Sequence, residues 1–470
     1  MKLTTLRQLS LVGAFCAAAL TASAQIIELR ATINGAQENP AVTTPASGTA
    51  VMLYDINANT FDLIVSIRGM TNTITLSHIH EAAAGANGPV VTNIGPEAVY
   101  TRTGDTLTAT FRNISHAGGD PLRLLQGGAY YNIHSAQFPG GEIRGQLIAR
   151  PVRLIANIDV AQEQAAMPAA NLAGITTFGG AVVIYDPVAN TVALRHTLFN
   201  YTSTLTNAHI HIGAPGVSGG VITQLFQGAL ASNFSATTGF ITASHEPAPF
   251  VPADNQQLAR IRALLSGGCY LNYHSQAFPN GQARGQLTVS SEALNTRMGN
   301  LSVRSFVGAG DQVLIGGISI QGNEPVRVLI AAKGPSLTAF GVAGALANPR
   351  LALFSGANQI AANDDVGTPT VGTELARIPN VPTNPLESAL VVTLPPGNYT
   401  AQVSSAAGTG VAILEAYDLR NLPSTLAIAS TDPVVPASAS TRSVAAASGK
   451  PVAPELCVAT PLPVTAVATR

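Results

Sequence analysis

The chain lacks tryptophan and has few charged residues, 24 basic and 25 acidic among 470. Its net charge of −1 gives no reason to expect nucleic acid or an anionic membrane as a partner. Only three cysteines are present, Cys16, Cys269 and Cys457, so the dense pattern of a disulfide framework is missing. We expect Cys269 to be a small buried residue. No later apolar run reaches the roughly 20 residues that a membrane span needs.

The N-terminus has the features of an export signal. Lys2 and Arg7 supply positive charge, and residues 9–20 form an apolar stretch too short to span a membrane. Residues 22–24 read Ala-Ser-Ala, as at a signal cleavage site. We therefore expect residues 1–24 to be a signal peptide and the protein to be secreted or displayed at the cell surface.

Histidines are the most informative residues present, because eight of the nine occupy matching positions of an internal duplication. Only His196 lacks a counterpart, and no histidine follows His274. The matched pairs are His78 with His209, His80 with His211, His116 with His245, and His134 with His274. A repeated pattern of imidazoles indicates either a repeated site or a repeated structural feature.

The strand and turn pattern predicts an all-β protein. Each copy consists of short runs rich in β-branched and aromatic residues, separated by Gly, Pro and Asn, which is typical of antiparallel sandwiches and barrels. One short helix is expected per copy, at residues 120–126 and 255–265. The expected parts are two tandem antiparallel β-sandwich or barrel domains at residues 25–150 and 151–290, a linker at 291–300, a third β-sandwich at 301–420 and a disordered low-complexity tail at 421–470.

The His-Ile-His triplets carry the main chemical hypothesis. Side chains alternate between the two faces of a strand, so both imidazoles of a triplet share one face. A third imidazole from another strand would complete an open three-histidine site of the type that copper or zinc uses. The two candidate sets are His78, His80 and His134 in the first copy and His209, His211 and His274 in the second. The alternative is a half-buried polar layer in which these rings bond to each other and to backbone, and both interpretations remain open.

Other matched residues are weaker candidates for a metal site. They are His116, His245, Glu38 and Glu163. The two carboxylates would serve as a fourth ligand or orient a histidine, but pairing with Arg144 and Arg284 is a more frequent use of such residues, so we expect ion pairs. No nucleophile motif is found, and no acidic residue beside the triplets is shared by both copies. We therefore assign no catalytic residue.

With these residues in view, both copies resemble the CHRD domain, which is named for its occurrence in chordin and is also found in bacterial secreted proteins. The shared elements are the Ala-Gln-Glu near the start, the His-Ile-His before a Gly-rich loop, and the ending Tyr-x-Asn-x-His…Pro-x-Gly…Arg-Gly-Gln-Leu at residues 130–147 and 270–287. The resemblance covers about residues 26–290 and implies an all-β extracellular module. The second copy has Asn-Gly-Gln-Ala-Arg at residues 280–284, so a role that requires the carboxylate of Glu142 cannot be shared.

The third segment resembles an uncharacterised β-sandwich module of bacterial secreted proteins. The matching stretches are Val-Arg-Val-Leu-Ile at residues 326–330, Gly-Pro-Ser-Leu at 334–337, Asn-Asp-Asp at 363–365 and Leu-Pro-Pro-Gly-Asn-Tyr-Thr at 394–400. This resemblance implies an adhesive or surface-display accessory without catalysis.

These features together predict a secreted, modular and non-enzymatic protein that binds or scaffolds an extracellular protein or polymer of unknown identity. The two three-histidine sets are candidate sites for one copper or zinc ion in each CHRD-like unit, with a purely structural histidine layer as the alternative. Neither nucleic acid nor a membrane span is expected. The alternative is a copper- or zinc-dependent extracellular metalloenzyme, which an open coordination position beside a concave pocket would favour.

Overall fold

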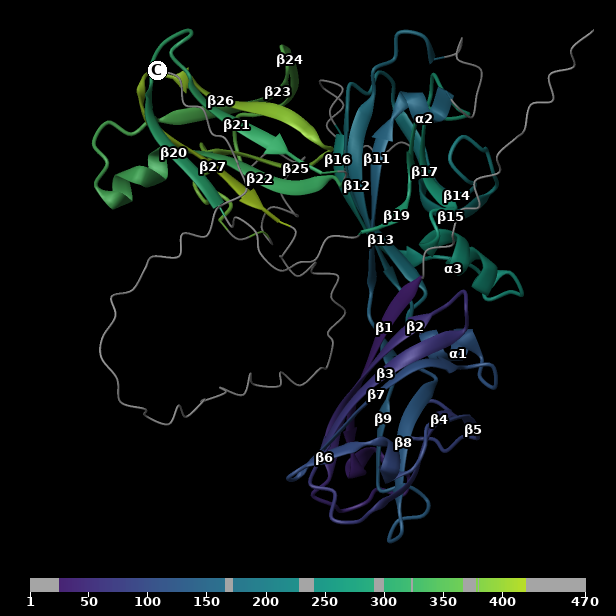
Figure 1. Ribbon diagram of the computed structural model, residues 1–470. Helices are drawn as coiled ribbons and strands as arrows, with labels where there is room; N and C mark the ends of the chain where they lie inside the picture. Colours follow the sequence, from purple (N-terminus) through teal and green to yellow (C-terminus); the bar gives the residue numbers. More distant parts are fainter. Residues whose placement is uncertain are drawn as a thin grey trace, which may run out of the picture.

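Strands dominate the computed structural model, which describes residues 25–164, 172–227, 241–290, 300–322, 324–366, 378 and 380–419 (Figure 1). The expected signal peptide, nearly all of the linker, and the tail lie outside these residues, so those expectations stay predictions. None of the helices in the described part combines the length and the apolar character needed to cross a membrane.

The first module is an antiparallel sheet that curls around its own core. Its elements are β1 (Ile26–Asn34), η1 (Gly35–Gln37), β2 (Ser47–Asp55), β3 (Thr60–Arg68), β4 (Ile74–Glu81), β5 (Val90–Asn93), η2 (Glu97–Val99), β6 (Thr101–Thr103), β7 (Thr106–Ser115), α1 (Pro121–Leu125), β8 (Ala129–Ser135), β9 (Ile143–Gln146) and β10 (Ile148–Ala149). The strand order is β5-β4-β8-β9-β1-β2-β3-β7-β6, and β10 pairs with β1.

The second module repeats this order. Its elements are β11 (Val152–Asp159), α2 (Val160–Gln164), β12 (Phe178–Asp186), β13 (Thr191–Phe199), β14 (Leu205–Ile212), β15 (Val221–Gln227), β16 (Ile241–Pro249), α3 (Gln257–Leu265), β17 (Cys269–Ser275), β18 (Ala283–Gln286) and β19 (Thr288–Val289). The order β15-β14-β17-β18-β11-β12-β13-β16 matches the first module from β5 to β7, with β19 paired to β11 as β10 is to β1; β6 has no counterpart in the described part of the second module. The all-β tandem architecture is confirmed, and α1 and α3 lie where the two helices were expected.

Alternating side chains build the core of these modules. In β1, Ile27, Leu29, Ala31 and Ile33 are buried, while the residues that alternate with them are exposed or half-buried. Burying such side chains stabilises the fold by roughly 1.5–3 kcal/mol each. Ile79 in β4 is fully buried as well, which sends its two histidine neighbours to the opposite face. Cys269 is buried and forms no disulfide, as expected for a small core residue. Burial raises the pKa of its thiol to about 12.

The third module is a sandwich of two four-stranded antiparallel sheets. Its elements are β20 (Asn300–Val307), β21 (Leu314–Ile320), β22 (Val326–Lys333), η4 (Pro335–Phe340), β23 (Asn348–Ser355), β24 (Asn358–Asn363), β25 (Ser388–Leu394), β26 (Gly397–Ala407) and β27 (Gly410–Asp418). One sheet has the order β20-β27-β22-β25 and the other β21-β26-β23-β24. Both contribute to one core, for example through Val392 and Val403.

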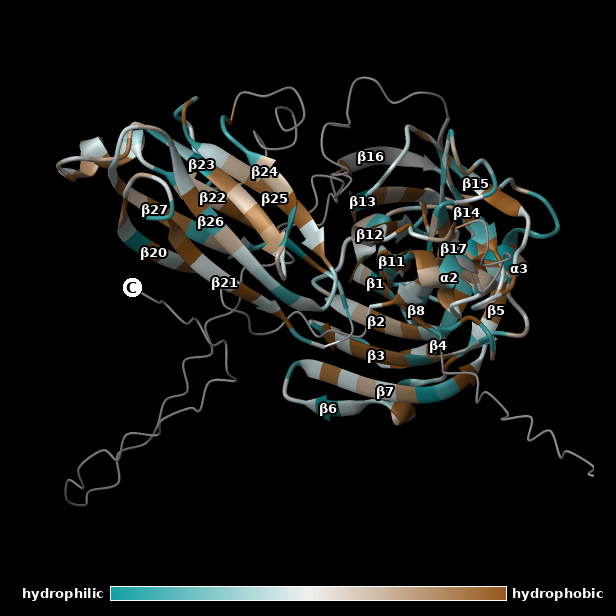
Figure 2. Ribbon diagram, turned by 90° about the horizontal axis from the view of Figure 1, so that it is seen from above, coloured by the Kyte–Doolittle hydropathy of each residue, from teal (hydrophilic) through white to brown (hydrophobic). Residues whose placement is uncertain are grey.

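This third sandwich packs against the outer face of the second module, where β25 lies beside β12 and β13 (Figures 1 and 2). Phe199 at the end of β13 is fully buried in the core of the sandwich, 5.0 Å from the ring of Phe178. The backbone N–H of Thr393 donates to Thr197 Oγ1 at 2.9 Å. The first module has Arg68 at the position of Phe199, so the two modules have diverged on this face.

Replacing Phe199 by the residue of the first module should detach the sandwich. The Phe199→Arg change removes a buried ring and buries a charge, so we expect at least about 3 kcal/mol of destabilisation, measured as the shift in the urea unfolding midpoint. The control is Phe306→Arg, at a ring that is 60% exposed, with an expected change below about 0.5 kcal/mol. Equal effects of the two changes would contradict this interface.

Candidate metal centres

In each module, the strand that carries the two histidines of the triplet pairs with the strand that carries a third histidine. In the first module β4 pairs with β8, which places His78 opposite Asn132 and His80 opposite Tyr130. His134 is two residues along β8 from Asn132, so it lies on the same face of the sheet. The pairing of β14 with β17 repeats this register in the second module.

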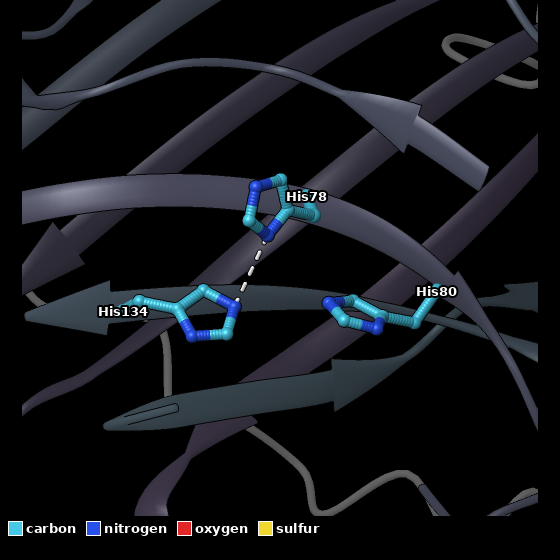
Figure 3. A group of neighbouring side chains, drawn as sticks. All are labelled: His78, His80 and His134. Carbon is cyan, nitrogen blue, oxygen red and sulfur yellow. Dashed lines mark hydrogen bonds between the residues drawn. The ribbon is translucent and has the colours of Figure 1, made fainter. Parts of the chain in front are cut away.

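Possible ligand atoms meet at one point in each module. The groups are His78, His80 and His134 in the first module and His209, His211 and His274 in the second. Within each group the ligand atoms all lie within 4.8 Å of one another. Figure 3 shows the three rings of the first module turned toward a common space, with Nδ1 of His78 3.2 Å from Nε2 of His134.

Backbone carbonyls fix which nitrogen faces that space. Nδ1 of His80 lies 2.9 Å from the carbonyl oxygen of Gly88, and Nδ1 of His134 lies 3.0 Å from that of Pro139. A carbonyl only accepts, so each Nδ1 carries the hydrogen and each Nε2 presents its lone pair. The second module repeats both contacts at 2.9 Å, from His211 to Gly219 and from His274 to Pro279. Such an outer hydrogen bond is the usual support of a metal-binding histidine.

The loop after the triplet is held in place by the same constellation. The N–H of Gly88 donates to the hydroxyl of Tyr130 at 3.2 Å, and the ring of Tyr130 stacks on His80 at 5.0 Å. Arg144 lies over the same tyrosine ring and donates to the carbonyl of Ala86 at 3.1 Å. A Cβ on Gly88 would lie 1.9 Å from the carbonyl oxygen of Glu81, so only glycine allows this close approach.

The environment favours neutral imidazoles. Burial, followed by the charges of His134 and His80, lowers the pKa of His78 to about 4, and burial likewise lowers the pKa of His274 to about 4. Burial also lowers the pKa of each of the other four rings. Among the residues that the structure describes, no Asp, Glu or Cys joins either group. All six rings are therefore neutral near pH 7, the form that coordinates metals.

Several inward-facing nitrogens have no partner in the described structure. They are Nε2 of His80 in the first module and Nδ1 of His209, Nε2 of His211 and Nε2 of His274 in the second. Buried polar atoms are normally hydrogen-bonded, and leaving one unpaired costs roughly 1–3 kcal/mol. A concentration of such atoms at one point indicates that a ligand completes the site.

Comparison with known proteins places both clusters in one family. The family model for the CHRD domain matches residues 29–147 and again residues 157–287, together more than half of the chain. The chain belongs to the CHRD family. Each histidine group lies inside one CHRD domain, while the third sandwich lies beyond the matched residues.

Other comparisons add nothing to this assignment. No curated protein matches the chain significantly. Among solved structures, a chain from the atomic structure of Sulfolobus Turreted Icosahedral Virus aligns over 84% of this chain and 79% of its own length at 8% identity. Its TM-score of 0.13 is too low to bear on fold or function.

Of the two weaker histidine candidates, His116 is not brought into the cluster of its domain. His116 of the first CHRD domain is fully buried, with Nδ1 3.2 Å from Thr92 Oγ1 and Nε2 3.9 Å from Glu81 Oε1. Its counterpart His245 lies on β16, and its side chain is outside the described part of the structure.

The expected ion pairs of Glu38 with Arg144 and of Glu163 with Arg284 are wrong. Both carboxylates and both arginines are described, and no ion pair joins them. The arginine donors go to backbone carbonyls and side-chain amides instead: Nε of Arg144 donates to the carbonyl of Gln37 at 2.5 Å, Arg284 donates to two loop carbonyls, and each arginine also donates to one amide oxygen. One oxygen of each carboxylate is buried without a hydrogen bond. Burial raises the pKa of Glu38 and of Glu163 to about 7, against the lowering effect of the nearby arginine.

The sequence hypothesis missed the backbone atoms and the aromatic ring that orient the histidines. Gly88, Pro139 and Tyr130 all do so, and none is a ligand type. Their recurrence at the same positions of the second copy, as Gly219, Pro279 and Tyr270, was the available signal.

Removing the buried acid should change how stability depends on pH. The folded pKa of Glu38 is about 7, above its ordinary value of 4.5, so the stability that its protonation contributes is complete below 4.5 and is lost as pH rises through 7. Gln mimics the protonated acid at every pH. The free energy of unfolding of Glu38→Gln, relative to that of the unchanged protein, should therefore rise by about 3 kcal/mol as the pH is raised from 4.5 to 8. Urea unfolding across this range measures it. Glu163→Gln is the internal replicate, and a pH-independent difference for both variants would contradict the burial of these acids.

Proposed function

We propose that the protein is a secreted modular binding or scaffold protein in which each CHRD domain holds one copper or zinc ion on three histidines. The proposed ligands are Nδ1 of His78 with Nε2 of His80 and His134, and Nδ1 of His209 with Nε2 of His211 and His274. The observation that carries the proposal is the convergence of three neutral imidazoles, twice, with matching backbone support.

The donor set fits such an ion. Metal–nitrogen bonds of about 2.0–2.1 Å place two nitrogens of a tetrahedral site about 3.4 Å apart. The closest pair in the first domain is already at 3.2 Å, and every ligand atom is within 4.8 Å of the others. Small rotations of side chains that lie on two paired strands therefore complete the site.

The type of donor atom limits which metal ions suit the site. Neutral imidazole nitrogens suit zinc, copper, iron and nickel, whereas calcium and magnesium prefer oxygen and iron–sulfur clusters need thiolates. Neither group has a described carboxylate or thiolate, and a site of three histidines with an open position is typical of zinc and copper.

The open position supports a binding role. An ion with three protein ligands accepts a further ligand from outside and polarises it as a Lewis acid. Five of the six histidines are 7–8% exposed and His209 is half-buried, so the ion would be reached from the surface, where a donor group of an extracellular protein or polymer would complete the coordination.

The same open position favours the second candidate, a metalloenzyme. In the first CHRD domain the described pocket of about 220 Å³ is lined by Glu38, Asn39, Gly85 and Arg144, among others, and by none of the three histidines. A concave pocket at the ion itself would be needed for a substrate. Turnover of a small redox or hydrolysable substrate by the metal-loaded protein, lost in His80→Ala/His211→Ala, would establish the enzyme instead.

The proposal predicts two metal equivalents per chain. The full chain, stripped of metal and then dialysed against zinc or copper, should retain two ions by elemental analysis, because each CHRD domain supplies one complete donor set. His80→Ala and His211→Ala should each retain one, and the double variant none. At a hundredfold excess over the dissociation constant, binding should stabilise the folded CHRD domains by about 2.7 kcal/mol.

His116→Gln is the matched control, because it changes a histidine of the same domain outside the cluster and should keep both ions. Fewer than one ion in the unchanged protein, or full retention in the double variant, would exclude the proposed centres.

A further inference from the structure

The two CHRD domains differ at the first histidine of the triplet. In the second domain His209 Nε2 lies 3.1 Å from Gln224 Oε1, which is held on the neighbouring strand β15 directly opposite His209. In the first domain the residue opposite His78 is Asn93, which is one methylene shorter, and no hydrogen bond joins these two side chains. The other supporting contacts are the same in both domains.

This difference sets the proton position on the ring. The amide oxygen of Gln224 only accepts, so His209 carries its hydrogen on Nε2 and presents a bare Nδ1 to the cluster. That Nδ1 is buried and has no partner, and neither does Nε2 of His274. The second domain therefore already has three lone pairs facing one point.

The first domain is arranged differently. Nε2 of His134 is an acceptor, because its Nδ1 donates to the carbonyl of Pro139. The 3.2 Å contact between His78 Nδ1 and His134 Nε2 therefore requires the hydrogen on Nδ1 of His78, the same atom that would bind the ion. Before a metal binds, this hydrogen has to leave Nδ1 for Nε2 and the bond between the two rings has to break.

We infer that the two metal centres are inequivalent. The second CHRD domain binds its ion at least tenfold more tightly than the first and fills first. Gln224 is the positioning residue responsible for this difference. This inference rests on the proposed function. The size of the difference follows from the loss of 10- to 100-fold in metal affinity that removal of an outer partner of a histidine ligand typically causes.

Single-site variants of the full chain isolate the two affinities. Zn²⁺ is titrated into metal-free protein against a competing chelator, with His211→Ala reporting the first domain and His80→Ala the second. We expect a dissociation constant at least tenfold lower for the His80→Ala chain. Equal constants in the two chains would overturn the inference while leaving the proposed function intact, and no binding by either chain would overturn both.

Exchanging the positioning residues tests Gln224 itself. In the His80→Ala chain, Gln224→Asn should weaken Zn²⁺ binding 10- to 100-fold. Gln224→Glu keeps an acceptor oxygen at the same reach, so this variant should bind Zn²⁺ as tightly as the chain with Gln224. In the His211→Ala chain, Asn93→Gln should tighten binding severalfold, a gain that misfolding cannot produce. No change in any of the three variants would overturn the assignment.

Imidazole ¹⁵N spectra of the metal-free protein test the cause. We expect His209 to carry its hydrogen on Nε2 and His78 on Nδ1, and Asn93→Gln should convert His78 to the form of His209. The same tautomer for His78 and His209 in the unchanged protein would contradict the mechanism.

Discussion

Four hydrogen bonds between histidine Nδ1 atoms and backbone carbonyls control both clusters. Because a carbonyl accepts only, the bonds to Gly88 and Pro139, and to Gly219 and Pro279, leave each Nε2 without a hydrogen and facing the cluster. Burial keeps the rings neutral, so the lone pairs stay available near pH 7. The tyrosine hydroxyl and the arginine guanidinium hold the loop that carries the Gly88 carbonyl in the first domain and the Gly219 carbonyl in the second.

Duplication has preserved this arrangement while the surroundings changed. The second CHRD domain has Phe199 on its outer face, where the third sandwich packs, and Gln224 beside its cluster. The first domain has Arg68 and Asn93 at these places. The residues that orient the histidines are the same in both domains. The residues that differ lie at the contact with the third sandwich and beside the first histidine of each cluster.

Much of this architecture could be predicted from the sequence. Period-two alternation and turn residues gave the all-β tandem domains and both short helices, and the i, i+2 spacing placed His78 and His80 on one face with Ile79 in the core. The recurrence of Gly88 and Pro139 in the second copy marked the positions, but it could not show that their carbonyls act, because a carbonyl belongs to every residue and only the folded loop selects these two. The expected pairing of Glu38 with Arg144 failed for a similar reason: the arginine donors are used by loop carbonyls that no side-chain pattern reveals.

Anomalous diffraction from crystals grown with zinc or copper tests the central claim most directly, because it locates the ion and its ligand atoms together. We predict one peak in each CHRD domain, about 2.0–2.1 Å from Nδ1 of the first histidine and from Nε2 of the other two. Peaks away from both clusters, or histidine rings that keep their present contacts with no ion between them, would contradict the account.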